Sequence, residues 1–438
     1  MGGNNGLNCL NGLNGSNRVC FLLSKMIKES RQYKKPELVA PAGSMDKLKT
    51  AIEYGADAVY AGGKDFNLRN ASANFTLDEI GLAVDYVHRK DKKLYITLNI
   101  FAHNHHITKI EEYLKELARY PVDAFIVSDP GVLTFVREII PEAPIHISTQ
   151  ANCTNTRAAD FWHKQGVKRV VLARELSLSE ISEISANSEC KTEVFVHGAM
   201  CLSYSGRCYL SAYMANRGAN LGDCAQSCRW KYSLVEEERP NEYFPVFEDG
   251  EFTSVMSSRD LCMIQHIPEL ISAGVDAWKI EGRMKSQYYV ATVTRIYREA
   301  IDTFFENGVY EYQDRWLEEL GKISNRGYNT GFFLGNPGEN GQRVGEESGY
   351  TQDYKFVGLF DSPKEEKLAG VIVKNKFEVG DDIEVMGKRL DQDFIQNIKE
   401  MYNQEMEPIK KANPGQRVFI IPQKPVEEYF IIRRKVEK

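Results

Sequence analysis

From Glu37 to Arg283, short apolar segments alternate with amphipathic ones. The apolar segments have the length and the β-branched and aromatic content of buried strands. Eight strands are predicted, over Glu37–Ala42, Asp57–Gly63, Lys93–Ile100, Asp123–Asp129, Ile145–Gln150, Arg169–Glu175, Glu193–Gly198 and Asp276–Arg283. Apolar residues at three- and four-residue spacing predict helices over Met45–Tyr54, Leu77–Arg89, Ile110–Tyr120, Gly131–Ile139 and Thr156–Gln165.

The regular alternation of strands and helices indicates βα units with parallel strands. Several helical segments end at a glycine before the next strand, at Gly55, Gly166 and Gly274, where we expect left-handed helix caps. Eight consecutive units predict an α/β fold, a closed TIM-like (β/α)8 barrel. An open doubly wound sheet is the alternative.

The pattern changes near Arg326, after which a Gly- and Asn-rich segment is typical of a linker. Strand-like runs follow at Tyr354–Phe360, Leu368–Lys374, Asp382–Met386, Gln416–Pro422 and 429–434. We predict four parts: a disordered N-terminal tail (1–34), a barrel domain (35–326), a linker (327–348) and a small C-terminal β-barrel domain (349–438).

Polar residues collect at the C-terminal ends of the predicted strands, the end that carries the active site in (β/α)8 barrels. They are Asn99, Asp129, Gln150, Arg174, Glu175, His197, Lys279, Glu281 and Arg283. These residues are candidates for binding and chemistry. The last three are also compatible with a layer of ion pairs at the barrel mouth.

The connection between the seventh and eighth strands is longer than a βα loop requires. Residues 199–256 form what we call the cysteine insertion, with Cys201, Cys208, Cys224 and Cys228 in a C-x6-C-x15-C-x3-C spacing. Four thiolates suffice for a [4Fe-4S] cluster or for one zinc ion. Structural zinc sites use two close pairs, and only the second pair is close here. The spacing favours a cluster, and zinc and free thiols remain alternatives.

Composition indicates in which class of protein and in which cellular compartment this chemistry would occur. The chain has 438 residues, 42% of them hydrophobic, which is enough for a large core and a smaller second one. No apolar run is long enough to cross a bilayer and the chain start lacks the features of a signal peptide, so we expect a cytoplasmic protein with no membrane contact. Nine cysteines then favour metal or redox chemistry. The net charge of -6 provides no overall basic field for nucleic acid.

Three further cysteines, Cys153, Cys190 and Cys262, lie on or near apolar stretches. We expect them to be buried as small hydrophobic side chains. Cys262 is a substitute ligand if the cysteine insertion folds back toward the eighth strand.

Several segments resemble peptidase family U32, the collagenase-like peptidases. They are PELVAPAGSMDKLKTAIEYGADAVYAGG (36–63), NIFAHN (99–104), ISTQANCTN (147–155), VVLARELS (170–177), EVFVHGAMCLSYSGRCYLS (193–211) and KIEGRMKSQYYVATV (279–293). The resemblance implies an oxygen-independent hydroxylation factor with a [4Fe-4S] cluster, and the chain is most similar to the branch that hydroxylates tRNA wobble uridine at carbon 5 with prephenate as the oxygen source. The C-terminal segment resembles the small β domain of the family.

Within this resemblance the cluster ligands would be Cys201, Cys208, Cys224 and Cys228. His197 and Glu281 would shuttle protons, and Arg174, Arg283 and Lys285 would bind carboxylate or phosphate groups. Gln150 is a further candidate for substrate binding, and Trp230 offers a stacking surface for a base of the tRNA anticodon loop.

Two other functions remain open at this point. The chain lacks the H-E-x-x-H and G-x-S-x-G motifs of common peptidases, but Cys201 with His197 as its base would make a collagenase-like cysteine peptidase. A cluster-bearing scaffold that acts with a partner protein is the other alternative. The sequence does not decide the oligomeric state.

Overall fold

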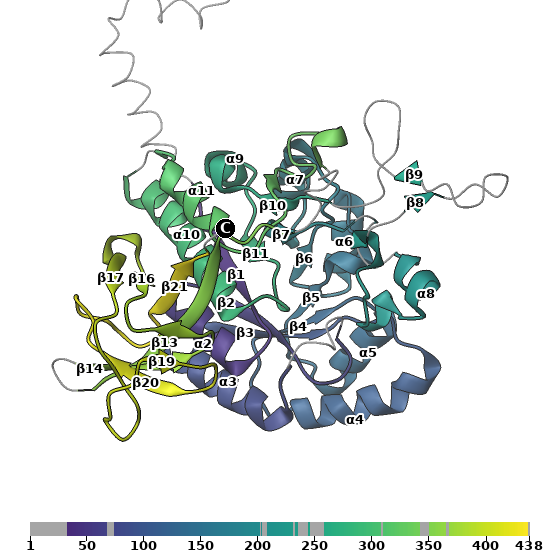
Figure 1. The fold of residues 1–438 in the computed structure, drawn as a ribbon. Coiled ribbons are helices and arrows are strands. Elements are labelled where there is room, and N and C mark those ends of the chain that lie inside the picture. The colour runs from purple at the N-terminus through teal and green to yellow at the C-terminus, as the bar shows by residue number, and fades with distance from the viewer. Residues whose placement is uncertain are drawn as a thin grey trace, which may run out of the picture.

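We describe a computed structural model of the chain for residues 33–67, 74–201, 203, 208–230, 233–234, 244–245, 258–307, 310–341, 350–364 and 368–436. Its larger domain is a closed barrel of eight parallel strands (Figure 1). The strands are β1 (Glu37–Ala42), β2 (Ala58–Gly62), β3 (Lys93–Leu98), β4 (Ala124–Val127), β5 (Ile145–Ile147), β6 (Arg169–Val171), β7 (Lys191–Ala199) and β11 (Ala277–Ile280). Because β11 pairs with both β1 and β7, the predicted barrel is confirmed and the open sheet is excluded.

Helices cover the outside of the barrel, and their ends follow the expected local chemistry. They are α2 (Met45–Glu53), α3 (Leu77–Arg89), α4 (Ile107–Leu117), α5 (Pro130–Ile139), α6 (Thr156–Lys164), α7 (Leu178–Asn187), α9 (Ile267–Ser272) and α10 (Gln287–Asn307). Thr76 and Ser177 form capping boxes at the starts of α3 and α7. Gly55, Gly166 and Gly274 have positive φ angles of 100°, 75° and 72°, which confirms the predicted left-handed caps.

After the cysteine insertion the chain returns to the barrel as a strand that the sequence did not indicate. This strand, β10 (Asp260–Cys262), pairs antiparallel with the end of β7, and β12 (Tyr328–Asn329) pairs with β10. Part of the segment predicted as a linker, residues 327–348, therefore belongs to the barrel sheet. The predicted disordered tail lies outside the described residues except for its last two.

The C-terminal domain is an antiparallel seven-stranded sheet in the order β17-β16-β21-β13-β14-β20-β18. These strands are β13 (Tyr354–Lys364), β14 (Leu368–Val373), β16 (Asp382–Met386), β17 (Phe394–Asn397), β18 (Met401–Tyr402), β20 (Arg417–Ile420) and β21 (Ile431–Lys435), with a separate pair of β15 (Phe377–Glu378) and β19 (Lys411–Ala412). The domain has its own apolar core. All five predicted strands of this domain are present.

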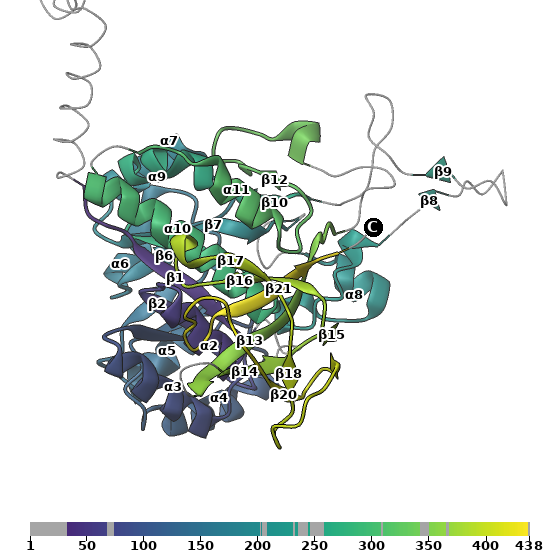
Figure 2. The same ribbon diagram turned by 60° about the vertical axis from the view of Figure 1, so that its left-hand side comes forward.

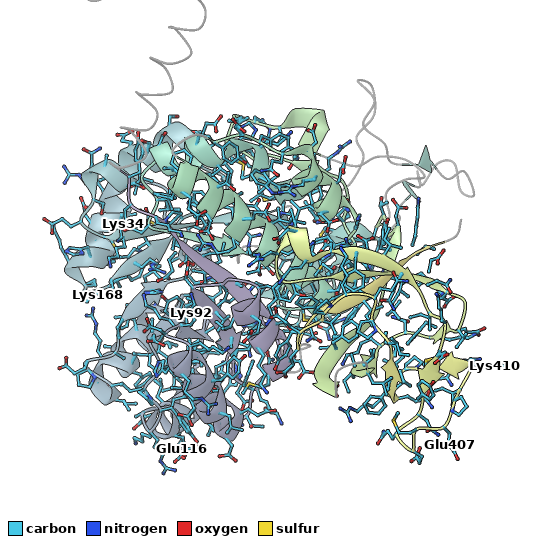
Figure 3. All side chains as sticks on the ribbon, turned by 90° about the vertical axis from the view of Figure 1, so that its left-hand side faces the viewer. Lys34, Lys92, Glu116, Lys168, Glu407 and Lys410 are labelled. Carbon is cyan, nitrogen blue, oxygen red and sulfur yellow. The ribbon has the colours of Figure 1, made fainter. Side chains whose placement is uncertain are left out.

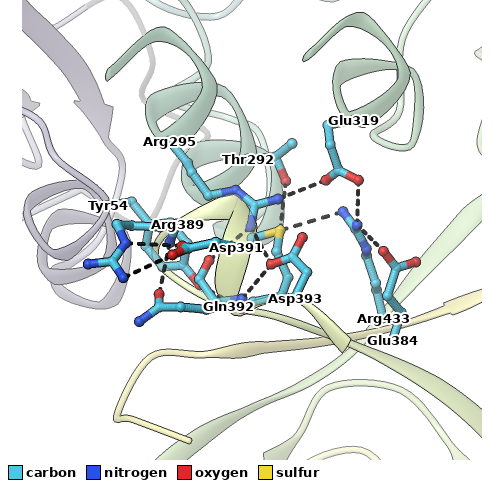
Figure 4. A network of polar contacts seen from close by, with 12 residues as sticks. Tyr54, Thr292, Arg295, Glu319, Glu384, Arg389, Asp391, Gln392, Asp393 and Arg433 are labelled. Carbon is cyan, nitrogen blue, oxygen red and sulfur yellow. Dashed lines mark hydrogen bonds and ion pairs between the residues drawn. The ribbon is translucent and has the colours of Figure 1, made fainter. Parts of the chain in front are cut away.

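The two domains are joined by a buried network of charges, drawn in Figure 4. Glu319 of α11 (Asp314–Gly321) accepts hydrogen bonds at 2.8 Å from Arg295 of α10 and from Arg433 of β21. Arg295 also donates to Asp393 at 2.7 Å, and Arg433 donates to Glu384. The C-terminal domain is thus fixed against the helices on one side of the barrel, as Figures 1 and 2 show.

Charged side chains lie on the outside of both domains (Figure 3). Lys34 and Lys168 of the barrel domain, and Glu407 and Lys410 of the C-terminal domain, are exposed and point away from the two cores. Among the residues that the structure describes, none of the helices has the length and apolar character needed to span a bilayer.

Candidate functional site

A pocket of about 130 Å³, which we call the mouth pocket, opens at the C-terminal ends of the barrel strands. Seven of the eight barrel strands, or the residues directly after them, contribute side chains, and the cysteine insertion closes one side. The lining residues are Tyr60, Thr97, Asn99, Ile126, Ser148, Thr149, Gln150, Val171, Arg174, Phe195, Cys201, Cys208, Ala219, Cys224, Lys279, Glu281 and Arg283. The structure therefore brings together most of the polar strand-end residues in one cavity.

One wall of the mouth pocket is cationic. Arg174 lies 4.0 Å from the centre of the Phe195 ring and donates a hydrogen bond of 2.8 Å to the carbonyl oxygen of Ala199. Its Nη2 atom is 3.9 Å from Oε2 of Glu281, and the Tyr60 hydroxyl is 3.5 Å from the same oxygen. This arrangement places a guanidinium group, a carboxylate and a phenol within reach of one small ligand.

Lys279 lines the bottom of the mouth pocket, next to the cationic wall. Its ammonium group lies 2.7 Å from Oε1 of Glu193 and 4.3 Å from the centre of the Tyr60 ring. Deeper in the barrel, Arg169 bridges Glu193 at 3.0 Å and Glu37 at 2.8 Å. Burial alone would raise the pKa of Glu193, but Lys279 and Arg169 outweigh it and lower the pKa. The floor is thus a chain of alternating charges that holds Lys279 in place.

Arg283 is buried beside this wall, with only 3% of its surface exposed. Its Nη1 atom donates to Oγ1 of Thr97 at 2.7 Å, and its Nη2 atom donates to the side-chain oxygens of Asn67 and Asn74. A Cβ atom at Gly62 would lie 2.7 Å from Nη1 of Arg283. The absence of a side chain at Gly62 therefore makes room for this guanidinium group.

Three of the four cysteines of the insertion, Cys201, Cys208 and Cys224, line the mouth pocket, whereas Cys228 does not. Within the described residues, no three cysteine sulfurs lie within 4.8 Å of one another. A tetrahedral zinc ion needs closer sulfurs, because each Zn–S bond is about 2.3 Å long. A [4Fe-4S] cluster binds each cysteine at a different iron and so accepts wider spacing. The described cysteine sulfurs therefore do not form a ready tetrahedral zinc site, and the [4Fe-4S] cluster remains a prediction.

His197 does not line the mouth pocket. Its ring packs against Tyr289, Tyr297 and Tyr328, and within the described residues neither ring nitrogen has a hydrogen-bond partner. Burial lowers the pKa of His197 to about 3. A Cys201–His197 hydrogen bond is therefore not formed. The shuttling of protons by this histidine remains a prediction.

The reason for this orientation is an irregularity in strand pairing. Lys279 of β11 is opposite Phe195 of β7, but the next residue, Ile280, is opposite His197, so Val196 is skipped. Side chains alternate between the two faces of a strand, and one extra residue reverses the alternation. His197 therefore faces outward although Glu193 and Phe195 face the barrel interior.

Two other predicted site residues lie outside the pocket. Lys285 donates a hydrogen bond of 3.3 Å to the carbonyl oxygen of Ser324 and lies 4.4 Å from the centre of the Tyr350 ring. Trp230, at the end of a short 3-10 helix (Ser227–Arg229), is 45% exposed. Their roles in substrate binding remain predictions.

The remaining described cysteines behave as expected. Cys153, Cys190 and Cys262 are buried in the core of the barrel domain, which confirms the prediction of small hydrophobic side chains. Burial raises the pKa of these thiols to about 11, 12 and 11. Cys262 does not line the mouth pocket.

A comparison with family models identifies the chain over most of its length. Residues 43–343 match the model of peptidase family U32, and residues 352–433 match the C-terminal domain of the same family. The chain belongs to peptidase family U32. The resemblance seen in the sequence segments is thus confirmed.

Three U32 relatives are similar along nearly the whole chain. The tRNA hydroxylation protein P1 of Bacillus subtilis is 42% identical, over 85% of this chain and 88% of that protein. The tRNA hydroxylation protein P of Escherichia coli is 37% identical, over 91% of this chain and 97% of that protein. A protein of Porphyromonas gingivalis named collagenase is 34% identical, over 90% of this chain and 95% of that protein.

Sequence reasoning missed several residues of the U32 pocket, namely Tyr60, Thr97, Ser148, Thr149 and Phe195. The prediction considered only the last residues of each strand, whereas the pocket extends one or two residues further into the barrel interior. For Thr97 the signal was present in the alternation, because Thr97 stands two residues before Asn99, which is the spacing of side chains on one face of a strand. Ser148, Thr149 and Gln150 instead follow β5, and residues 149–151 form a short 3-10 helix, so alternation gives no signal there.

Proposed function

We propose that the chain hydroxylates tRNA at carbon 5 of the uridine in the first anticodon position, without molecular oxygen. The similarity to proteins named tRNA hydroxylation protein supports the general activity. The observation that carries the finer proposal is the mouth pocket, in which three cysteines and a cationic wall meet. A tRNA substrate also suits a cytoplasmic protein.

We further propose that Cys201, Cys208, Cys224 and Cys228 hold a [4Fe-4S] cluster at the edge of the mouth pocket. When bound, the cluster would carry electrons during the reaction, in which hydroxylation oxidises the uracil base by two electrons. The backbone N–H of Gln226 lies 3.4 Å from the sulfur of Cys224 and donates to it. Such N–H groups stabilise thiolate ligands. A zinc ion at the same residues is the alternative.

Prephenate is the proposed oxygen source, and the cationic wall supports this choice. Prephenate carries two carboxylates, and planar guanidinium groups bind carboxylates with defined geometry. Arg174 and Lys279 line the wall, and Arg283 is held rigid beside them by Thr97 and Asn67. Glu281, next to Arg174 and Tyr60, is placed to accept or return a proton at the bound ligand.

The cysteine insertion also offers surfaces to unpaired nucleotides. Its helix α8 (Leu210–Ala215) and the preceding residue carry Tyr213 and Tyr209, which are 75% and 74% exposed, and Trp230 lies beyond the fourth cysteine. Bases of single-stranded RNA stack on aromatic side chains. We propose that these residues contact the anticodon loop while the target uridine enters the mouth pocket.

The proposal is tested by complementation. An Escherichia coli strain lacking its tRNA hydroxylation protein P is grown without oxygen, with this chain or with its Cys224→Ser or Cys190→Ser variant. We expect the 5-hydroxyuridine-type nucleosides to return with the wild-type chain and with Cys190→Ser, whose sulfur is in the core, but not with Cys224→Ser. Mass spectrometry of tRNA nucleosides measures this. Nucleosides that stay absent with the wild-type chain, present at normal level, contradict the proposal.

A peptidase activity is the second candidate, because one relative is named collagenase. The geometry supports it less well. A cysteine nucleophile needs a base within hydrogen-bonding reach, and His197 makes no hydrogen bond to Cys201 in the described structure. A scaffold that acts only with a partner protein is distinguished by testing the purified chain alone.

A further inference from the structure

Another part of the mouth pocket is neutral and built from amide and hydroxyl groups. We call Asn99, Ser148 and Gln150, which line the pocket, the amide wall; they follow the strands β3 and β5. Ser128, which follows β4 between them, does not line the pocket but donates a hydrogen bond to Gln150. The cationic wall, by contrast, comes from β6 and β11. The pocket therefore has one side suited to an anion and one side suited to a neutral polar group.

Gln150 is the centre of the amide wall. Its side-chain oxygen accepts hydrogen bonds from Nδ2 of Asn99 at 3.2 Å, from the hydroxyl of Ser128 at 3.0 Å and from the hydroxyl of Ser148. Three donors on one amide oxygen fix the orientation of the amide group. The nitrogen must then point away from these three residues.

The side-chain nitrogen of Gln150 has no hydrogen-bond acceptor among the described residues. Gln150 is 95% buried and lines the mouth pocket, yet its Nε2 atom makes no hydrogen bond to any part of the chain that the structure describes. Such a group, held in place at a pocket wall, is a ready donor to a ligand acceptor.

The backbone around Gln150 is also held firmly. The hydroxyl of Thr149 donates to the carbonyl oxygen of Leu172 at 3.1 Å, and the side chain of Asn152 donates to the carbonyl oxygen of Gln150 at 3.0 Å. Asn152 itself has a left-handed conformation with φ of 51°. This loop therefore supports Gln150 from both sides.

We propose that Gln150 is a specificity-determining residue that donates a hydrogen bond to the carbonyl oxygen at carbon 4 of a uracil base in the mouth pocket. The inference rests on the proposed function, since it assumes that the uridine to be hydroxylated enters this pocket. The neutral amide wall matches the neutral edge of uracil, and the carboxylates of the oxygen source are left to the cationic wall. Cytosine has an amino group at carbon 4, which is a donor, and two donors repel.

The test exchanges the donor for an acceptor. In Gln150→Glu, one carboxylate oxygen keeps the contacts with Asn99, Ser128 and Ser148, and the other replaces the amide nitrogen. Short anticodon stem-loops with U or C in the first anticodon position are titrated into the anaerobically purified full chain, and fluorescence anisotropy gives the two dissociation constants. We expect the wild type to prefer U, and the preference to fall by about tenfold or reverse in the variant.

Two further variants make the result specific. Gln165→Glu adds the same charge at the exposed C-terminal cap of α6 and should leave the preference unchanged. Ser148→Ala removes one of the three donors to Gln150 and frees its amide to rotate, so it should weaken the preference for U without reversing it. This variant tests the same role if Gln150→Glu does not fold. Thermal melting confirms folding in each case.

The outcomes separate the two proposals. A wild-type chain that prefers U, with Gln150→Glu folded and the preference unchanged, overturns the role of Gln150 and leaves the tRNA function intact. If the wild type binds the U and C stem-loops with equal affinity, the role of Gln150 is likewise overturned and the tRNA function is left intact. A wild-type chain that binds neither stem-loop and restores no hydroxylated nucleoside in cells rejects both the function and the inference.

Discussion

The substitution Glu319→Gln tests how the two domains are held together. Glu319 is 93% buried and lies 2.8 Å from side-chain nitrogens of Arg295 and Arg433 (Figure 4). The Nζ atom of Lys322 is also 2.8 Å from Glu319. Arg295 and Arg433 are almost completely buried. The variant keeps the shape of the side chain but removes one of the anions that neutralise these cations.

The size of the effect follows from the pKa of Glu319. Burial alone would raise it, but Arg433 and Arg295 lower it from its ordinary value of 4.5 to about 2. A carboxyl pKa lowered to this extent corresponds to about 3 kcal/mol at neutral pH. Removing one partner of a buried ion pair costs a similar amount, about 3 to 5 kcal/mol. Because the pKa is lowered on folding, this stability is present above pH 4.5 and is lost as the pH falls toward 2.

Urea unfolding followed by tryptophan fluorescence measures this prediction, since Trp316 lies in the same helix as Glu319. At pH 7 we expect Glu319→Gln to lower the free energy of unfolding by about 3 kcal/mol, and the difference from wild type should shrink as the pH falls below 4.5. The control is Glu318→Gln on the exposed side of α11. A loss below about 1 kcal/mol, a loss equal to that of the control, or a difference independent of pH would refute the reasoning.

The other predictions concern the site. Cys208→Ala should lose the iron and sulfide of anaerobically purified protein, whereas Cys153→Ala in the core should retain them; equal metal contents would contradict the ligand assignment. Gly62→Ala places a methyl group 2.7 Å from Arg283, so we expect a higher KM for the oxygen source and a lower melting temperature, and unchanged values of both would argue against the need for glycine. His197→Leu should melt at the same or a higher temperature, because no described residue bonds to the imidazole. If the predicted proton role is correct, the folded variant should lose tRNA hydroxylation, and retained activity would contradict that role.

The barrel was predictable because its signals are local. Each strand is a short apolar run, each helix has an amphipathic period, and glycines such as Gly55 and Gly166 end the helices. Strand ends in a barrel converge by topology, so Gln150 and Arg174 could be placed together without knowing any distance.

What could not be predicted depends on contacts distant in the chain. The skipped residue Val196, which turns His197 away from the pocket, follows from the pairing of β7 with β11 and leaves no mark in the sequence of β7. Likewise, Glu319 and Arg433 are far apart in sequence, and nothing nearby indicates that they meet in a buried network. The unbonded nitrogen of Gln150 also emerges only from the three donors around its oxygen.

The pairing of β7 with β10 has a practical consequence for engineering. The polypeptide leaves the barrel at Ala199 and re-enters it at Asp260, and these two residues are directly opposite each other in the sheet. An excursion whose two ends already meet can change in length at little entropic cost to the scaffold. The segment between Ala199 and Asp260 can therefore be exchanged between U32 proteins at this junction. Such an exchange should transfer its cysteines and its exposed aromatic residues together.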